Sequence, residues 1–201
     1  MTSIKDIIET LEHFAPLPLQ EDWDNAGLQI GLTETDASGV LLCLDVNEDI
    51  VREAQREGCN LIVSHHPLLF RGRKKITPDD YVGRCVIKSI RNGLCLYAAH
   101  TNLDNARGGV NFRMASGIGL RDVDFLLPNN GGAGGSGVIG TLPSPMRSDE
   151  FVRLVTRAFR AGVARFNDSV RETISTVALC GGAGSFLIPE AILHRADAFV
   201  T

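Results

Sequence analysis

The stretch Asn60-Leu61-Ile62-Val63-Ser64-His65-His66-Pro67 decides how this sequence folds. It begins with a short apolar run that a proline closes, and such a run is typical of a strand buried on both faces. Similar apolar runs lie on either side of it, at 40–46 and 94–99, and helical patterns at 48–57 and 80–92 separate the three. Strands that alternate with helices predict an α/β fold with a mainly parallel sheet.

The rest of the sequence continues this alternation in two lobes. We expect a first α/β lobe over 1–127, a glycine-rich connection over 128–137 and a second lobe over 138–201. A phosphate-cradling glycine loop needs a helix directly after it, and here a strand-like segment follows, so we interpret the loop as a flexible connection. Further helices are expected at 3–15, 108–118, 148–160 and 186–195, and further strands at 138–142, 163–166, 173–180 and 196–201.

The composition is that of a folded protein outside the membrane. The 201 residues include 20 basic and 24 acidic side chains, for a net charge of −4, and 44% are hydrophobic. The longest apolar run, 94–99, has six residues, whereas a membrane-spanning helix needs about 20. The first helical segment carries charges throughout, which excludes a signal-peptide core. We therefore expect a cytoplasmic protein without a membrane partner.

Charge is distributed unevenly along the chain. Residues 1–58 carry a net charge of −10 and residues 59–201 a net charge of +6. The excess of cations either solvates helix faces, which we favour, or faces an anionic ligand such as a phosphate. The basic run Arg71-Gly72-Arg73-Lys74-Lys75 could likewise hold phosphates at a pocket mouth or solvate a loop. This run is too short and isolated to indicate nucleic acid binding.

Two adjacent histidines, His65 and His66, directly follow the central predicted strand. In open α/β sheets, ligands bind beyond the carboxyl ends of the strands. Rings on a regular strand point to opposite faces, but at a strand end before Pro67 they can splay toward two different metal ions. A hydrogen-bonded surface pair accounts for the same residues, and the pair alone does not separate these interpretations.

A second polar cluster, His100 and Asp104, follows the next predicted strand, so the two clusters are expected at one edge of the sheet. A carboxylate can bridge two cations, and imidazole with carboxylate suits zinc, iron or manganese. The alternative for Asp104 is a turn or helix cap. For His100 we favour a hydrogen bond that orients a ligand over direct coordination. His13 and His194 lie on predicted helices away from this cluster.

A third polar segment, Trp23-Asp24-Asn25-Ala26-Gly27-Leu28-Gln29-Ile30-Gly31, offers turn-forming side chains and two glycines. We interpret it as a structural loop. The single tryptophan of the chain lies beside these polar groups, so a ligand wall is the alternative.

Three motifs occur in order and together carry a family resemblance. They are 24–29 (Asp-Asn-Ala-Gly-Leu-Gln), 64–68 (Ser-His-His-Pro-Leu), and 100–104 (His-Thr-Asn-Leu-Asp) with 108–111 (Gly-Gly-Val-Asn). The sequence resembles the GTP cyclohydrolase I type 2-like family, also called the Nif three-like family. The glycine turn at 180–185 and the terminal 196–201 fit it too, so the resemblance covers nearly the whole chain.

The resemblance implies two α/β lobes of the Nif three-like fold, a dinuclear metal site in the cleft between them, and a ring-shaped homohexamer. It assigns two divalent ions (zinc, iron or manganese) to His65 and His66, one each, with Asp104 as a bridge. His100 and Asn25 are expected to orient a ligand or to contact substrate. The implied partner is a small molecule, in particular a nucleotide, and not a nucleic acid.

The family completes its metal site with a His and a Glu four residues apart, after a Thr-Gly turn near the C-terminus. This sequence stops at Thr201, where that turn would begin. Glu190 and His194 have the spacing but precede the last strand in the wrong order, so they do not receive the role. We therefore expect the remaining ligands to lie beyond Thr201 in a truncated sequence. Three candidate ligands cannot saturate two ions, so we expect weakened metal binding.

Two functions follow as hypotheses. The first is a metal-dependent hydrolase acting on GTP or a nucleotide-like substrate, in which divalent ions generate hydroxide near neutral pH. The alternative is a non-enzymatic metal-binding scaffold, metal carrier or regulatory protein, because no separate nucleophile or acid/base pair accompanies the candidate ligands. A structural α/β module with incidental histidines is a third interpretation, and it predicts no bound metal.

Overall fold

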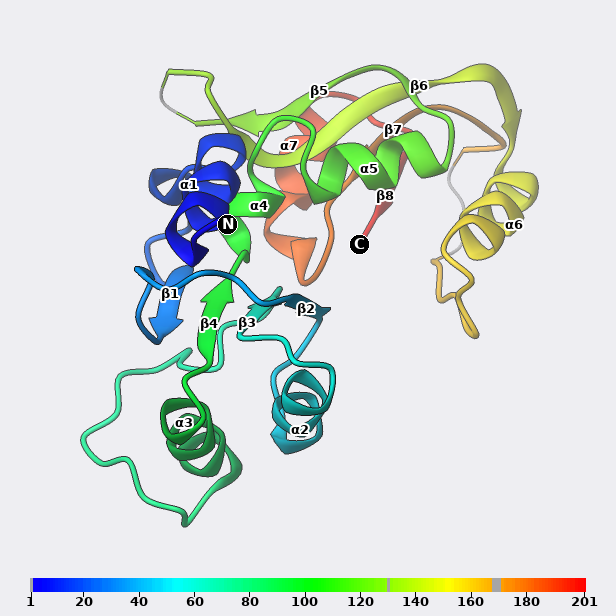
Figure 1. Ribbon diagram of the computed structural model, residues 1–201. Helices are drawn as coiled ribbons and strands as arrows, with labels where there is room; N and C mark the ends of the chain where they lie inside the picture. Colours follow the sequence, from blue (N-terminus) through cyan, green and yellow to red (C-terminus); the bar gives the residue numbers. More distant parts are fainter. Residues whose placement is uncertain (1, 130, 168–170) are drawn as a thin grey trace. The chain divides into compact units, whose positions relative to one another are not determined.

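The computed structural model describes residues 2–129, 131–167 and 171–201. The chain divides into two compact units, Met1–Leu103 and Asp104–Thr201. We call them the first and the second unit (Figure 1). Both combine helices with one four-stranded sheet, which agrees with the expected α/β class.

The first unit has a mixed sheet in the order β1-β4-β3-β2. Strands β2 (Val40–Cys43), β3 (Leu61–Ser64) and β4 (Cys95–Ala98) are parallel, and β1 (Gly27–Ile30) runs antiparallel to β4. The helices are α1 (Ile4–Phe14), η1 (Leu17–Leu19), α2 (Glu48–Arg56), α3 (Tyr81–Arg91) and α4 (Thr101–Asp104), the last of which ends across the unit boundary.

Burial on both faces explains why the central strands read as continuous apolar runs. Ile62 and Leu96 pack with α2 and α3 on one face, whereas Leu61, Cys95 and Tyr97 pack with α1 on the other. Successive side chains of a strand point to opposite faces, so every position of β3 and β4 is apolar or small. All residues of these two strands are buried.

The second unit has a sheet in the order β5-β6-β7-β8. Strands β5 (Arg121–Pro128), β6 (Gly135–Arg147) and β7 (Thr173–Leu179) are antiparallel, and β8 (Ala198–Val200) is parallel to β7. Helices α5 (Val110–Gly117) and α6 (Ser148–Ala158) share one core cluster with β6 and β7. The helices η2 (Gly184–Leu187) and α7 (Ile188–Leu193) contribute to a second cluster with β5 and β7.

The structure differs from the sequence expectation at four places. The glycine-rich stretch is not a connection between lobes: its described residues join β5 to β6 within the second unit, and Asn130 lies outside the described residues. Strand β5 was not expected. Asp122 has a positive φ of 51°, and the register of β5 against β6 shifts between Arg121 and Asp124. This irregularity breaks the alternation of apolar and polar residues that marks a strand. Strand β1 lies where we expected a loop.

The strand expected at 163–166 is wrong. Residues 161–167 have no regular secondary structure, and residues 168–170 lie outside the described part of the chain. Val163 is 79% exposed and Phe166 72% exposed, so this segment has no buried face to stabilise a strand.

No described helix is both long and apolar enough to cross a membrane.

Candidate metal centre

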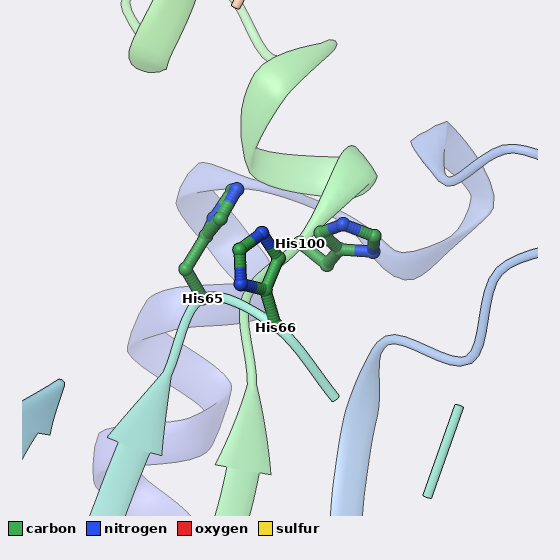
Figure 2. A group of neighbouring side chains, drawn as sticks. All are labelled: His65, His66 and His100. Atoms are coloured by element: carbon green, nitrogen blue, oxygen red, sulfur yellow. The ribbon is translucent and has the colours of Figure 1, made fainter. Parts of the chain in front are cut away.

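Three histidines lie together beyond the ends of two neighbouring parallel strands. Ser64 at the end of β3 pairs with Ala98 at the end of β4, so the residues that follow both strands emerge at the same edge. His65 and His66 follow β3 and His100 follows β4; candidate ligand atoms of the three all lie within 4.8 Å of one another. Figure 2 shows the three rings gathered above the strand ends. The structure thus brings His100 of the second cluster beside the histidine pair.

Each ring is oriented by a hydrogen bond from its Nδ1 atom. His65 Nδ1 lies 3.0 Å from the Ala99 carbonyl oxygen, and His66 Nδ1 lies 2.8 Å from Asp45 Oδ1. His100 Nδ1 lies 2.7 Å from Asp24 Oδ1. A carbonyl or carboxylate oxygen only accepts, so each Nδ1 carries the proton and each neutral ring has an unprotonated Nε2. This is the way metal-binding histidines are typically held.

Asp24 is the best-satisfied polar group of the centre. Its side chain has no exposed surface. Oδ2 accepts hydrogen bonds from the backbone N–H of Thr101 at 3.1 Å and from the Thr101 hydroxyl, while Oδ1 accepts from His100. Burial acts to raise the pKa of Asp24, but the hydrogen bonds from Thr101, His100 and the Asn25 backbone outweigh it, and the pKa lies below its usual value. Asp24 therefore stays charged and fixes the His100 ring.

The segment that follows the histidine pair is tied to the start of β1. Asn25 Nδ2 donates to the Leu69 carbonyl oxygen at 2.7 Å, and the Leu69 N–H donates to Gln29 Oε1 at 3.1 Å. These contacts give the first motif a role: it holds the turn after Pro67 in place. They also give Asn25 a structural task, whereas its expected contact with a ligand stays a prediction.

Two aromatic rings flank the centre. The Trp23 and Phe70 rings lie with their centroids 6.0 Å and 6.4 Å from that of His100. Trp23 is 60% exposed and Phe70 44% exposed, so both offer open aromatic surface beside the histidines.

The histidines differ in their access to solvent. The His66 side chain is 46% exposed, and that of His100 is 13% exposed. A ligand can therefore reach the centre from the side of His66. His13 and His194 are also exposed, and neither belongs to the group of three. His194 lies in the second unit, with its Nε2 3.2 Å from Glu190 Oε1.

Asp104, the expected bridging ligand, is the first residue of the second unit. Its carbonyl oxygen accepts a hydrogen bond from Asn111 Nδ2 at 3.0 Å, and Asn111 Oδ1 accepts from the Gly181 N–H at 2.8 Å. Asn111 is 1% exposed. It joins the end of α4 to the glycine turn after β7, which explains why both belong to the recognised motifs. Metal ligation by Asp104 stays a prediction.

The sequence analysis missed Asp45. This residue follows β2, the third parallel strand, and its carboxylate orients His66. Asp45 lies two residues after the end of β2 but inside the run 40–46 that was expected to be strand, so the sequence pattern did not mark it as a residue beyond a strand end.

The donor set fits a divalent metal ion. Nitrogens that share one tetrahedral zinc ion lie about 3.4 Å apart. The candidate ligand atoms of the three histidines lie within 4.8 Å of one another, near this spacing. Imidazole nitrogens suit zinc and iron, and a nearby carboxylate extends the range to manganese. His100 is close enough to serve as a ligand, and its hydrogen bond to Asp24 is equally compatible with an orienting role.

Comparisons with known proteins identify the family of the chain. Residues 2–201 match the family model described as Duf34/NIF3 (NGG1p interacting factor 3). A "GTP cyclohydrolase 1 type 2 homolog" of Clostridium acetobutylicum is 33% identical over 200 residues, which are 98% of this chain and 75% of the relative. The crystal structure of Staphylococcus aureus hypothetical protein SA1388 matches with a TM-score of 0.92 at 28% identity, covering 99% of this chain and 78% of that one.

A Bacillus cereus protein related to NIF3 also matches with a TM-score of 0.92, at 25% identity over 100% of this chain and 82% of the other. The family match spans nearly every residue, including all three motifs that carried the resemblance. The chain belongs to the Duf34/NIF3 family.

Proposed function

We propose that this chain is a metal-dependent hydrolase of a nucleotide-like substrate, with GTP as the first candidate. The observation that carries the proposal is the gathering of three histidines, each with its Nδ1 proton held by an oxygen acceptor. Metal-binding histidines almost always donate their second ring N–H to such an acceptor, so three histidines held in this way at one place support a metal site. The name of the relatives, GTP cyclohydrolase 1 type 2 homolog, supports a nucleotide as substrate.

When bound, divalent ions lower the pKa of water toward neutrality and polarise the group under attack. In the proposed centre His65 and His66 would hold one divalent ion each, and Asp104 would be a ligand shared by both. The Ala99 carbonyl and Asp45 keep the two rings in place. The unprotonated Nε2 of His100 can accept a proton while Asp24 fixes the other side of the ring.

The surroundings suit a flat substrate. Trp23 and Phe70 expose their rings beside His100, and the two rings contact each other with centroids 5.9 Å apart. A purine can pack against such rings, because a nucleobase offers a π-face to an aromatic side chain. The proposal also includes the homohexamer that the family resemblance implies.

The exposure of His66 favours a second candidate, a metal carrier or regulatory metal-binding protein. A carrier must release its ion, and an open ligand makes exchange easier. Exchange and turnover therefore separate the two candidates.

The test uses the protein loaded in turn with zinc, iron and manganese. We expect elemental analysis to find bound metal, and we expect hydrolysis in a screen of GTP, other nucleotides and phosphoesters. The His65→Ala, His66→Ala double variant should lose both metal and turnover. The exposed His13 supplies the matched control, and His13→Ala should keep both.

The metal-carrier hypothesis would replace the hydrolase hypothesis on two findings together. The wild-type protein would bind metal without turnover above that of the double variant, and it would release the metal rapidly to a chelator. Equal metal content in the wild type and the double variant would reject the centre itself.

A further inference from the structure

A groove of about 570 Å³ adjoins the metal centre. It is bounded by the loop after the histidine pair and by the first turn of α3, and it begins at Pro67, the residue after His66. Its volume falls within the range of small-molecule sites. The lining consists of Pro67, Leu68, Phe70, the five residues 71–75, Tyr81 and Val82.

Four cations line this groove, and three of them are not neutralised by the protein. Arg73 forms an ion pair with Asp80. Arg71, Lys74 and Lys75 are exposed and have no ion-pair partner among the residues that the structure describes. Four positive charges within five residues repel one another, so an anion in the groove would relieve this repulsion.

Arg73 is the fixed member of the set. Its partner Asp80 also caps α3, because Asp80 Oδ1 accepts a hydrogen bond from the Gly83 N–H at 2.8 Å. The Arg73 side chain is 28% exposed, so its position is set by the wall of the groove. A guanidinium held in this way is suited to a phosphate group.

Open aromatic surface accompanies the cations. Tyr81 is 54% exposed and Phe70 44% exposed, and both line the groove. Phe70 also lies beside His100 and Trp23, so one ring borders both the groove and the metal centre. A ligand that carries phosphates at one end and an aromatic ring at the other matches this arrangement, in which the cations lie in the groove and the aromatic rings lie toward the histidines.

We propose that this groove binds the phosphate chain of a nucleoside triphosphate whose base lies toward the histidines. The proposal rests on the proposed function for the reacting end of the ligand, and it adds the residues that select phosphate. The groove is the size of a mononucleotide site, so the proposal commits to a nucleotide and not to a nucleic acid strand.

The test measures binding to the full chain through the fluorescence of Trp23, the single tryptophan, whose ring centroid lies 5.9 Å from that of Phe70. The ligands are tripolyphosphate, GTP, guanosine and a short single-stranded RNA. The groove variant is Arg71→Gln, Lys74→Gln, Lys75→Gln; Arg73 is left intact because it supports the cap of α3. The control variant is Arg91→Gln, Arg113→Gln, Arg157→Gln, which removes three exposed arginines elsewhere.

We expect the Kd of the groove variant for tripolyphosphate and GTP to rise at least about tenfold, since three exposed charge contacts each contribute a few-fold. The control variant should stay within about twofold of the wild type, and guanosine should bind the wild type more weakly than GTP. Circular dichroism confirms that the variants fold. An equal loss in both variants, or no loss in the groove variant, overturns the proposal.

Two further measurements keep this proposal separate from the metal centre. The groove variant should retain the metal content of the wild type, and the His65→Ala, His66→Ala variant should retain tripolyphosphate binding. Loss of tripolyphosphate binding in the histidine variant would place the anion on the metal and overturn the groove. Tighter binding of RNA than of GTP, lost in the groove variant, would overturn the assignment to a mononucleotide. If the wild-type protein binds no metal but still binds tripolyphosphate, and the groove variant loses that binding, the hydrolase proposal is rejected and the groove proposal is supported.

Discussion

In the first unit three parallel strands end at one edge of the sheet, whereas in the second unit only β7 and β8 run parallel and a long antiparallel hairpin, β5–β6, fills the remainder. The residues after β2, β3 and β4 are Asp45, the histidine pair and His100, which contact one another. The residues after β7 form a glycine turn.

The second unit uses this turn for close packing of backbone. A Cβ atom at Gly184 would lie 2.6 Å from the Cys180 Cβ and 2.8 Å from Thr201 Oγ1, so no larger residue fits there. Thr201 Oγ1 accepts from the Gly184 N–H and donates to the Gly182 carbonyl, each at 2.8 Å. Parallel strand ends thus bring distant side chains together in the first unit, whereas the turn after β7 packs its glycine backbone closely; we call this turn the closed edge of the second unit.

The largest expected effect tests the closed edge. Asn111→Ala removes the side chain that satisfies the Asp104 carbonyl and the Gly181 N–H. Each buried backbone group left without a partner costs about 1–3 kcal/mol. We expect the free energy of unfolding, measured by chemical denaturation, to fall by about 3 kcal/mol. Asn92→Ala is the control, because Asn92 is exposed and donates to one carbonyl oxygen of its own helix; it should cost less than about 1 kcal/mol.

The loss of stability in Asn111→Ala should be local to the second unit. Amide hydrogen exchange should accelerate in β5, β6 and β7 more than in β2, β3 and β4. Uniform acceleration across both sheets would mean that the two units unfold as one, and the contrast between them would then be geometric only.

A smaller effect tests the open edge, by which we mean the edge of the first sheet where the residues after β2, β3 and β4 meet. Asp24→Asn keeps the shape of the side chain but replaces one carboxylate oxygen by an NH₂ group, which only donates. The asparagine therefore cannot accept hydrogen bonds from both the Thr101 N–H and His100. Loss of a group that orients a ligand typically lowers metal affinity 10–100-fold. We expect a drop of at least about tenfold in metal affinity, measured by competition with a chelator.

The matched control is Asp22→Asn, at an exposed acidic residue two positions earlier. It removes the same charge and should leave metal affinity unchanged. Equal losses in the two variants would show that Asp24 acts through net charge and not by holding the His100 ring.

The sequence predicted the open edge well for a physical reason. Strands buried on both faces are continuous apolar runs, and polar residues that interrupt them mark the strand ends, as His65 and His100 do. This was enough to identify the α/β class, the parallel core of the first unit and the convergence of His100 with the histidine pair.

Strands β1 and β5 were hidden by backbone effects that a residue pattern does not show. Strand β1 has four residues, Gly27–Ile30, and begins with a glycine whose φ is 101°. Its neighbour Gly31 approaches β4 so closely that a Cβ would lie 2.3 Å from Cys95 Sγ. Conversely, 163–166 has the residue types of a strand but nothing to pack against. Long-range packing, absent from local sequence, decided each case.

The smallest effect concerns how the helices beside the open edge are held. Glu48 on α2 accepts a hydrogen bond from Arg84 Nε at 2.7 Å and one from Lys88, both on α3. These bonds, Lys88 first and then Arg84, lower the pKa of Glu48 from 4.5 to about 2. A carboxyl group whose pKa is lowered by folding adds stability above its unfolded pKa, and this is lost as the pH falls through the folded pKa. The contribution of Glu48 should therefore be complete above pH 4.5 and disappear toward pH 2.

Thermal unfolding of the wild type and of Glu48→Gln between pH 2 and pH 6 measures this contribution. The variant should be less stable at pH 6, and the two curves should converge as the pH approaches 2. The second unit offers the contrast, because Asp149 on α6 pairs with Arg147 and Arg153, both local in sequence. Asp149→Asn should change stability less than Glu48→Gln at pH 6, since exposed pairs between neighbours in the chain contribute little and Glu48 joins two separate helices. A larger effect at Asp149 would show that the charge network of the first unit does not hold α2 and α3 together.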